Sequence, residues 1–466
     1  MHTDQLNATV KILTETLDEL EISQEPAILE SHGSDWTRFR KPSPAAVVFP
    51  RNVDEVVQLV RLAAQHRIPL VPSGGRTGLS GGAVAAAGEV VVSFDRMRRI
   101  IDFNPIDRTL VVEPGVVTQA IQAYAAEKSL YYPVSFASEG SSQIGGNIAT
   151  NAGGIRVLRY GLTRDQVVGL KVVDGHGEVL ECNAGLVKNA SGYDLRHLFI
   201  GSEGTLGFIV EATLRLTDQP SPSQVMLLAV TGIEAMMHVF QRFNDALTLT
   251  AFEFLSDVSM KYVCRGHGLA APMEGGSPFY ALLEYECAEA SSEDIALQCF
   301  ETCLESGFVE DGVISQSESQ AADLWRYREG ISEAITPYTP YKNDLSVRIS
   351  RVPAYLQALD QLVEAQYPDF EVLWYGHIGD GNLHMNILKP EEMETSEFEK
   401  ICSSVNSGVF ALTSQYQGSI SAEHGIGLLK QPYLNYSRTD ADVDRMRGIK
   451  AVFDPMNILN PGKLLA

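Results

Sequence analysis

A glycine-rich stretch constrains this chain more than any other feature of its sequence. Pro72-Ser-Gly-Gly-Arg-Thr-Gly-Leu-Ser-Gly-Gly82 follows Ile68-Pro-Leu-Val71, an apolar run typical of a buried strand. Such a loop can adopt positive φ angles and turn several backbone N–H groups toward one anion, such as a pyrophosphate. It lacks the Gly-Lys-Ser/Thr end of a Walker A loop, and it runs on toward Val90–Phe94 instead of opening a helix. Alone, it is compatible with a phosphate-binding loop or an ordinary turn.

A second stretch of small residues favours the phosphate-binding interpretation. It reads Ser138-Glu-Gly-Ser-Ser-Gln-Ile-Gly-Gly-Asn-Ile-Ala-Thr-Asn-Ala-Gly-Gly154. Two such loops in one fold suit a long diphosphate cofactor. The expected strand at 45–49 and helix from 52 to 64 precede the first loop, but that loop leads to another strand. A nicotinamide-binding Rossmann unit is therefore disfavoured.

Composition narrows the classes of protein that remain. The chain of 466 residues is long enough for two or three domains, and its formal net charge of −23 disfavours nucleic acid and anionic membrane surfaces as partners. No apolar run reaches the roughly 18 residues of a spanning helix, and the polar N-terminus does not resemble a signal peptide. None of the six cysteines forms a CxxC pair, so we expect reduced thiols and a cytoplasmic location.

The pattern of expected elements changes at the proline-marked segment Asp218–Pro222. Before it, an amphipathic helix over 8–20 precedes the glycine-rich region, and a helix is expected over 117–128. After it, strands are expected at 225–230, 251–255, 279–285, 371–376 and 383–388, with helices at 233–245 and 292–305. This order is compatible with an antiparallel sheet backed by helices.

The strongest chemical signal is Trp374-Tyr-Gly-His-Ile-Gly-Asp-Gly-Asn-Leu-His-Met-Asn386. Apolar residues flank a Gly-Asp-Gly-Asn turn, which predicts a hairpin with His377 and His384 on its two arms. His384 and Asn386 share one face of the second arm. Two converging imidazoles make half of a divalent metal site.

A candidate third ligand lies in Ser421-Ala-Glu-His-Gly-Ile-Gly427. Glu423 could complete a His2Glu site with positions open to substrate, which is the catalytic type of geometry. His424 beside it is a candidate general base. The alternative is that Glu423 and His424 cap a helix that begins near 427.

Together these motifs resemble the FAD-binding superfamily of vanillyl-alcohol oxidase and p-cresol methylhydroxylase (PCMH), in its D-2-hydroxyacid dehydrogenase branch. The resemblance extends over nearly the whole chain and includes Ala149–Gly161 and Phe453–Lys463. It implies an α+β fold, with a two-lobed FAD-binding domain and an antiparallel-sheet substrate cap domain. The implied parts are an N-terminal helical segment at 1–41, the FAD-binding domain at 42–218, the cap domain with the metal hairpin at 219–410, and a C-terminal segment at 411–466 that returns to the flavin.

The resemblance also implies which residues hold FAD. They lie in the two glycine-rich stretches, in the turn Gly201–Gly207 with the following strand, and near the C-terminus. Neither glycine-rich stretch contains a histidine or cysteine for covalent attachment, so we expect non-covalent FAD. The expected cofactor-binding residues are Pro72, Gly74, Gly75, Arg76, Thr77, Gly78, Ser80, Gly81, Ser142, Gly145, Gly146, Asn147, Thr150, Gly204, Ile209 and Asn460.

The same resemblance assigns the chemical roles. It implies His377, His384 and Glu423 as ligands of a divalent metal such as Zn²⁺, and His424 as the general base that also touches substrate. An α-hydroxy acid could chelate this metal, lose its hydroxyl proton to the histidine and pass a hydride from C2 to flavin N5. The other expected substrate-binding residues are Arg328, Ser332, Lys342 and Asn386.

The implied activity is oxidation of D-2-hydroxyglutarate to 2-oxoglutarate, with D-lactate, D-malate or glycolate as alternative substrates. Ser332 replaces a threonine of the family pattern, and Gly330 is unusual within a helix. A separate electron acceptor is expected, either an electron-transfer flavoprotein or a quinone-linked carrier, and a homodimer is compatible with the sequence. The rival classes are a non-catalytic FAD-binding subunit and an alkyl-transferring flavoenzyme, which would not need the metal-site residues.

Overall fold

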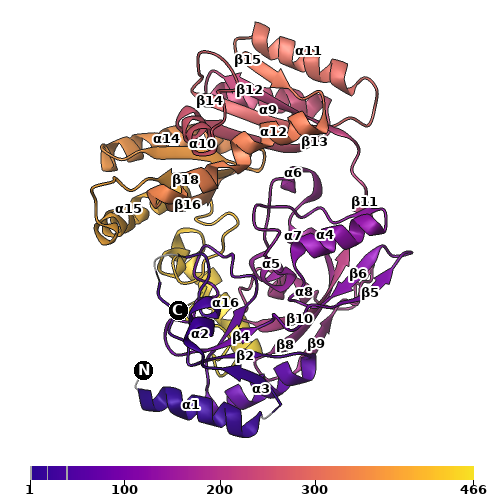
Figure 1. Cartoon of the computed structure of the whole chain (residues 1–466), viewed down its shortest axis with the longest axis vertical. Helices are drawn as coiled ribbons and strands as arrows, with labels where there is room; N and C mark the ends of the chain where they lie inside the picture. The colour runs from indigo at the N-terminus through magenta and orange to yellow at the C-terminus, as the bar shows by residue number, and fades with distance from the viewer. Residues whose placement is uncertain (1–2, 18, 38–39, 466) are drawn as a thin grey trace. The chain divides into compact units, whose positions relative to one another are not determined.

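The computed structural model describes residues 3–17, 19–37 and 40–465 and divides them into two compact units. Unit 1 comprises the described residues up to Gly154, then Gly161–Gln219 and the chain from Glu423 onward, while unit 2 comprises Ile155–Tyr160 and Pro220–Ala422. In Figure 1 the yellow C-terminal segment accordingly lies among the indigo and magenta elements of unit 1. The boundary expected near residue 410 falls inside helix α15 (Thr395–Gln415).

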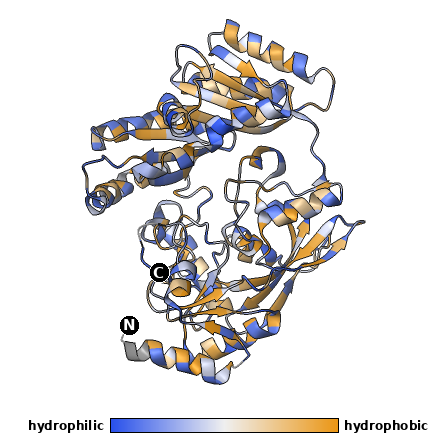
Figure 2. Ribbon diagram, viewed as in Figure 1, coloured by the Kyte–Doolittle hydropathy of each residue, from blue (hydrophilic) through white to orange (hydrophobic). Residues whose placement is uncertain are grey.

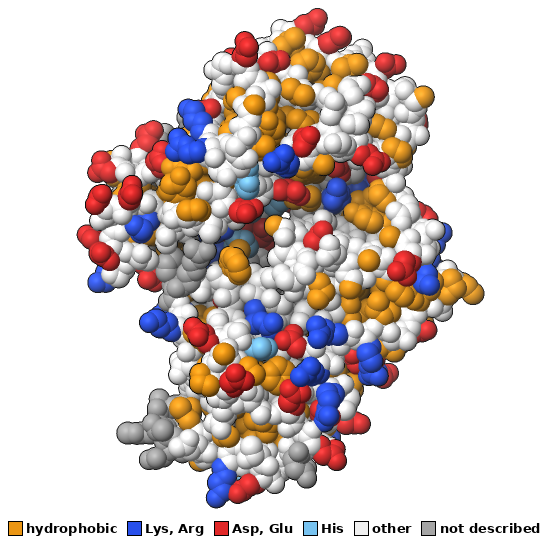
Figure 3. Space-filling model, in the orientation of Figure 1, with side chains coloured by type: hydrophobic (Ala, Val, Ile, Leu, Met, Phe, Trp, Pro, Cys, Tyr) orange, Lys and Arg blue, Asp and Glu red, His pale blue; other side chains and the backbone are white. Residues whose placement is uncertain are grey.

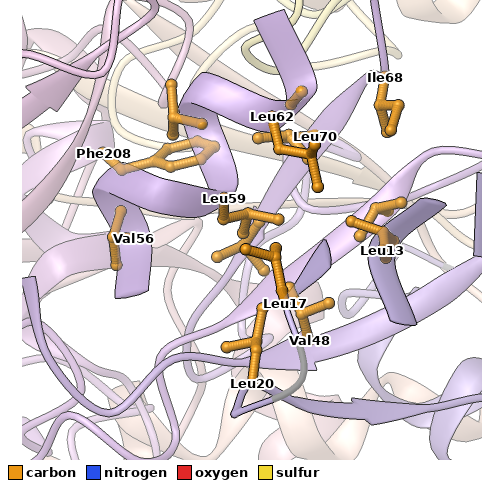
Figure 4. Packing of buried hydrophobic residues seen from close by; sticks show 14 of the residues in the cluster. Leu13, Leu17, Leu20, Val48, Val56, Leu59, Leu62, Ile68, Leu70 and Phe208 are labelled. Carbon is orange, nitrogen blue, oxygen red and sulfur yellow. The ribbon is translucent and has the colours of Figure 1, made fainter. Parts of the chain in front are cut away.

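Unit 1 contains a four-stranded sheet in the order β1-β2-β4-β3, which carries the first glycine-rich loop. Strands β2, β4 and β3 run parallel to one another, and β1 pairs antiparallel with β2. Leu13 of α1 and the following Leu17 and Leu20 lie in one core with Val48 and Leu59 of this lobe (Figure 4). The elements are α1 (Thr3–Thr16), β1 (Glu21–Ser23), α2 (Pro26–His32), β2 (Ala46–Phe49), α3 (Val53–His66), β3 (Leu70–Ser73) and β4 (Val90–Ser93).

A second sheet of unit 1 is antiparallel throughout, in the order β5-β6-β10-β8-β9. Helices α4 and α5 contribute to its apolar core through Ile121 and Ile148. The two sheets therefore form two lobes of unit 1. The elements are β5 (Ile100–Asn104), β6 (Thr109–Val112), α4 (Thr118–Glu127), β7 (Leu130–Tyr131), α5 (Ile144–Thr150), α7 (Thr163–Gln166), β8 (Val167–Asp174), β9 (Val179–Cys182), α8 (Arg196–Phe199), β10 (Gly207–Arg215), β11 (Thr217–Asp218), η4 (Gln431–Tyr436) and α16 (Asp440–Phe453).

Two local expectations from the sequence differ from the structure. Helix α1 begins and ends earlier than the expected 8–20, because the chain turns after Thr16 toward β1. The second glycine-rich stretch is not irregular throughout, since α5 forms inside it. Gly145 makes this helix fit, because a Cβ there would lie 2.7 Å from Cβ of Pro114. The close approach of two backbones thus outweighs the low helix propensity of glycine.

Unit 2 is built on one seven-stranded antiparallel sheet, in the order β15-β12-β14-β13-β17-β18-β16. Residues of α10, α12 and α13 pack against the sheet in one hydrophobic core. This core includes Trp325 of α12 and Leu373 of β17. The strands are β12 (Ser223–Val230), β13 (Leu249–Ser256), β14 (Phe279–Glu286), β15 (Val309–Ile314), β16 (Tyr341–Ser346), β17 (Val372–Gly376) and β18 (Asn382–Ile387). The helices are α6 (Val157–Tyr160), α9 (Ile233–Ala246), α10 (Asp257–His267), α11 (Ser292–Glu305), α12 (Glu318–Glu329), α13 (Ile331–Ala334), η1 (Thr336–Tyr338), η2 (Ile349–Arg351), α14 (Val352–Gln366), η3 (Ile378–Asp380) and α15.

The strands of both units are mainly hydrophobic in Figure 2, as buried strands require. Acidic and basic side chains are interspersed on the visible surface (Figure 3). Among the described residues, no helix has both the length and the apolar character needed to cross a bilayer. The six cysteines are all unpaired thiols, as the spacing predicted.

Asp360 on α14 gives unit 2 a pH-dependent stability. Burial, with a smaller contribution from the nearby Glu364 carboxylate, raises the pKa of Asp360 to about 6. The folded state therefore holds this proton more tightly than an unfolded aspartate, whose pKa is about 3.9. The charged carboxylate thus costs stability above about pH 6, and this cost fades as the pH falls toward 4.

Replacing Asp360 with asparagine should therefore raise the free energy of unfolding by about 1 kcal/mol at pH 8, after allowance for partial solvent screening. The gain should be much smaller at pH 4. Urea unfolding at the two pH values measures it, with Asp245→Asn on the exposed face of α9 as the control. An equal gain at both pH values would contradict the assignment.

Candidate functional site

A cavity in unit 1 collects most of its lining residues from three separate stretches of the chain. Its wall is formed by the loop after β3, by the second glycine-rich stretch with α5, and by the turn before β10. Of the residues expected to bind cofactor, it brings together Pro72, Gly74, Gly75, Arg76, Thr77, Gly78, Ser80, Gly145, Gly146, Asn147, Thr150, Gly204 and Ile209.

Three residues expected to bind cofactor are not on this wall. Ser142 bonds to Oγ1 of Thr118 at 2.8 Å, and Gly81 adopts a φ of 79° against Leu428. The side-chain amide of Asn460 donates to the carbonyl oxygens of Gly82 (2.9 Å) and Glu203 (2.7 Å). Asn460 therefore joins the first loop to the turn before β10 from behind the cavity.

The loops are held in place by close backbone approach and by one carboxylate. A Cβ on Gly75 would lie 2.3 Å from the carbonyl oxygen of Ser141, so only glycine lets the two glycine-rich stretches meet. Asp95 Oδ1 accepts from Gln143 at 2.7 Å, and its Oδ2 lies 3.2 Å from Nη1 of Arg76. Burial works to raise the pKa of Asp95, but the His32 hydrogen bond and the Arg76 charge hold it well below its usual range.

The cavity wall also presents polar atoms that no described residue satisfies. Buried Oδ2 of Asp35 and Oε1 of Gln143 lack hydrogen-bond partners among the described residues, and both residues line the cavity. Burial raises the pKa of Asp35. These acceptor oxygens fit the hydroxyl groups of a dinucleotide such as FAD, and the backbone N–H groups of the glycine-rich loops fit its phosphates.

His424 lies on the wall of this same cavity. Its Nε2 is 3.7 Å from Oε1 of Glu423, and both side chains are partly exposed. The backbone here forms turns rather than a helix beginning near 427, so the helix-capping alternative is wrong. His424 and the loops expected to bind FAD thus share one cavity within unit 1.

One face of the unit 2 sheet carries the other expected site residues. Lys342 of β16 lies opposite Asn386 of β18, and Asp344 lies opposite His384. On the other side of β18, His384 pairs with Tyr375 of β17. The predicted hairpin therefore forms, and its register puts a lysine, an amide and a histidine on one face.

An oxygen atom of a neighbouring side chain orients each of the two hairpin histidines. Nδ1 of His377 is 2.8 Å from Oε1 of Glu253 on β13, and Nε2 of His384 is 3.0 Å from Oδ1 of Asn382. The two imidazole rings lie 5.4 Å apart between centroids, at 85° to each other. A carboxylate or amide oxygen behind each ring is the usual support of a metal-ligating histidine.

Arg328 in the last turn of α12 is buried among these groups. Its guanidinium lies 4.9 Å from the Tyr375 ring centroid, and Nη2 is 2.7 Å from Oε2 of Glu253. That ion pair lacks hydrogen-bond geometry. Among the described residues, Nε of Arg328 and both polar atoms of the Asn386 amide also have no hydrogen-bond partner. Burial tends to raise the pKa of Glu253, but the His377 and Arg328 charges outweigh it and lower that pKa.

The structure explains the glycine between Arg328 and Ser332. A Cβ on Gly330 would lie 2.8 Å from both the Arg326 carbonyl oxygen and Nε2 of His267, and here α12 gives way to α13. Ser332 follows on α13, and its Oγ accepts from Nζ of Lys342 at 2.8 Å. Arg328, Ser332, Lys342 and Asn386 are thus gathered near the two histidines within unit 2.

Sequence reasoning missed the carboxylates that support these residues. Glu253 stands in Ala251-Phe-Glu-Phe-Leu255 of a fully buried strand, and a charge between two phenylalanines was a usable signal. Glu203 adopts a φ of 53°, a region that favours glycine, but nothing in the sequence shows that backbone angle. Asp35 and Asp95 lie in no recognisable sequence motif.

Comparisons with known proteins agree with this architecture. Residues 44–183 match the FAD binding domain family, and residues 219–464 match the family described as FAD linked oxidases, C-terminal domain. A D-2-hydroxyglutarate dehydrogenase of Stutzerimonas stutzeri is 54% identical over 457 residues, which cover 97% of this chain and 98% of that protein. The mitochondrial D-2-hydroxyglutarate dehydrogenase of Bos taurus is 37% identical over 95% of this chain and 80% of its own length.

Solved structures share the fold at low sequence identity. A p-cresol methylhydroxylase aligns with a TM-score of 0.78 at 14% identity, covering 100% of this chain and 97% of that one. An alkyldihydroxyacetonephosphate synthase aligns with a TM-score of 0.70 at 15% identity, covering 99% and 85%. The expected α+β fold, a PCMH-type flavin domain with an antiparallel-sheet second domain, is confirmed, and the chain belongs to the family of FAD-linked oxidases that includes the D-2-hydroxyglutarate dehydrogenases.

Proposed function

We propose that this chain is an FAD- and metal-dependent dehydrogenase that oxidises D-2-hydroxyglutarate to 2-oxoglutarate. The observation that carries the proposal is the buried Arg328. Its Nη2 forms an ion pair with Glu253, but its Nε has no hydrogen-bond acceptor among the described residues, and the same unit holds Lys342 and the unsatisfied amide of Asn386. Buried donors of this kind favour an anionic ligand. The names of the 54% and 37% identical relatives support this choice of anion.

In this proposal, different residues bind the two ends of the substrate. Arg328 and Lys342 hold the distal carboxylate, with Ser332 orienting the Lys342 ammonium through its 2.8 Å hydrogen bond. Asn386, opposite Lys342, binds near the hydroxy acid end. A short substrate such as D-lactate or glycolate has no second carboxylate, and it would leave both cations unused.

We propose that His377, His384 and Glu423 hold a divalent ion, Zn²⁺ being the first candidate. In this proposal Nδ1–H of His377 donates to Glu253 and leaves Nε2 as the ligand atom, while Nε2–H of His384 donates to Oδ1 of Asn382 and leaves Nδ1. Ser419 bridges to Ser346 at the end of β16, so at most about 14 Å of extended chain leads on to Glu423. Bound there, a divalent ion would act as a Lewis acid that lowers the pKa of the substrate hydroxyl.

His424 is the proposed general base. It takes the hydroxyl proton while the hydrogen on C2 leaves with its electron pair, so the C–O single bond becomes a carbonyl. When bound in the unit 1 cavity, FAD would accept that hydride and be reduced by two electrons. The unit 1 residues around His424 bind and orient the cofactor, and a separate carrier, either an electron-transfer flavoprotein or a quinone-linked protein, would then reoxidise it.

Anaerobic titration of the FAD-loaded protein tests the proposal directly. D-2-hydroxyglutarate should bleach the oxidised-flavin absorbance stoichiometrically, and D-lactate, D-malate and glycolate should do so only at much higher concentration. Lys342→Gln should raise the dissociation constant for D-2-hydroxyglutarate by about 10- to 100-fold, because a charged hydrogen bond is lost.

The same variant should scarcely affect D-lactate. Lys389→Gln is the matched control, because Nζ of Lys389 donates to backbone carbonyls of Pro390, Glu391 and Met393. Equal losses for the long and the short substrate in Lys342→Gln would reject the assignment of the distal carboxylate. A yellow protein that none of the four acids bleaches would reject the proposed function.

A further inference from the structure

Glu203 is a buried carboxylate in the turn before β10, and nothing in the proposed chemistry uses it. The residue is 6% exposed, and its φ of 53° lies in the region that favours glycine. A glutamate in such a position suggests that its side chain is needed there. Burial raises the pKa of its carboxyl group, although backbone hydrogen bonds oppose that shift.

Both oxygens of this carboxylate accept backbone N–H groups from the segment that carries His424. Ile426 donates to Oε1 at 2.7 Å, and Gly427 donates to Oε2 at 2.8 Å. The next two amides, of Leu428 and Leu429, donate to the carbonyl oxygen of Ser80 at 3.0 and 3.1 Å. Four successive amides after His424 are therefore fixed on the flavin lobe.

Close packing prevents this segment from shifting toward the lobe. A Cβ on Gly425, whose φ is 80°, would lie 3.1 Å from the carboxyl carbon of Glu203. A Cβ on Gly427 would lie 2.2 Å from the carbonyl oxygen of Ser80. The Asn460 amide holds the Glu203 carbonyl oxygen from the other side at 2.7 Å. Glu203 and the segment after His424 thus pack closely against each other.

Two simpler roles would also place a glutamate here. It could be a direct ligand of the cofactor, because Glu203 lines the cavity, or it could merely stabilise the lobe. The first role does not explain why both of its oxygens accept amides from the segment after His424. A purely stabilising role gives no reason why the amides should come from Ile426 and Gly427, so close to His424 in the chain.

We propose that Glu203 is a positioning residue, which sets the location of the His424 ring on the wall of the cavity by fixing the amides of Ile426 and Gly427. The inference rests on His424 as the base of the proposed function. A carboxylate suits the task because it gives each of the two N–H donors its own acceptor oxygen on one planar group. A glutamine offers a single acceptor, and its own NH2 would face an N–H.

The test compares Glu203→Gln and Glu203→Asp with the wild-type holoenzyme in anaerobic stopped-flow experiments. Glu203→Gln should retain FAD and bind D-2-hydroxyglutarate within about threefold, but its flavin should be reduced about 100-fold more slowly, as expected for a base displaced by about 1 Å. The pH profile of reduction should shift with it. Glu203→Asp keeps both acceptors and should recover part of the rate.

Asp174→Asn is the matched control, because Oδ1 of buried Asp174 likewise accepts two backbone amides, from His176 and Glu178, in a hairpin turn. It removes a buried charge but keeps Oδ1, and it should not slow flavin reduction. If Glu203→Gln loses FAD, Gly425→Ala takes its place in the test, because the added Cβ would press on the Glu203 carboxyl group. A normal reduction rate in an FAD-loaded Glu203 or Gly425 variant would overturn the proposal.

A second readout separates this inference from the proposed function. Modification of His424 by diethylpyrocarbonate, followed by peptide mass spectrometry, reports on the ring without any substrate. Glu203→Gln should change that modification rate at least threefold, and Asp174→Asn should not. If wild type is never bleached but the modification rate changes, the proposed function fails while the positioning role stands. An unchanged rate overturns the positioning role.

Discussion

Replacing His424 with asparagine should abolish reduction of the bound flavin by D-2-hydroxyglutarate, with a loss of about 10²- to 10⁴-fold in the rate constant. The expectation follows from the place of His424 on the wall of the cavity formed by the glycine-rich loops. The free imidazole has a pKa near 6.5, so it can accept a hydroxyl proton near neutral pH, whereas an amide cannot. The fold should survive, because the side chain is partly exposed.

Anaerobic stopped-flow absorbance measures this loss, and dithionite reduction of the same sample should remain normal. His176→Asn is the matched control. His176 is an exposed residue of a hairpin turn in the same unit, and its Nε2 lies 3.1 Å from the Val452 carbonyl oxygen. A His424→Asn variant that reduces its flavin within threefold of the wild-type rate would assign the base elsewhere.

Removal of the proposed metal ion should have an effect of similar size. Dialysis against a chelator should leave the protein yellow but stop substrate-dependent bleaching, because the hydroxyl pKa would return to its high value in water. Added Zn²⁺ or another divalent ion should restore bleaching, since His2Glu sites accept several metals. His377→Ala should lose the ion permanently, and Glu253→Gln should weaken its binding about 10- to 100-fold through the lost support of His377.

Elemental analysis gives a readout that does not depend on catalysis. Wild type should retain about one divalent ion per chain after gel filtration, and His377→Ala should retain none. His238→Ala is the control, because this exposed histidine of unit 2 only stacks on Phe308 at 4.6 Å between ring centroids. Undiminished bleaching in a metal-free sample would contradict the proposed role of the two hairpin histidines.

Local sequence patterns predicted the parts of the structure whose cause is local. The glycine-rich loop after β3 and the hairpin that carries His377 and His384 follow from turn residues beside apolar runs. Helix α11 occupies the expected residues 292–305 because its apolar spacing is regular. These are the features for which neighbouring residues suffice.

Features that depend on distant residues could not be predicted in the same way. Glu253 meets His377 across 124 positions, and Glu203 meets Ile426 across 223. Helix α5 forms in a glycine-rich sequence because Gly145 fits against Pro114, which no propensity scale contains. The resemblance to a known family supplied candidate site residues, but not the carboxylates that orient them.

The return of the chain to unit 1 at Glu423 has a consequence for biosynthesis. Leu459 pairs with Leu70 on the free edge of β3, and Asn460 holds the first flavin loop, so both depend on residues translated after unit 2. A ribosome-bound chain can complete the sheet of unit 2 while its flavin lobe still lacks an edge partner. FAD capture should therefore follow the synthesis of unit 2, and a truncation before Leu459 should give apoprotein prone to proteolysis.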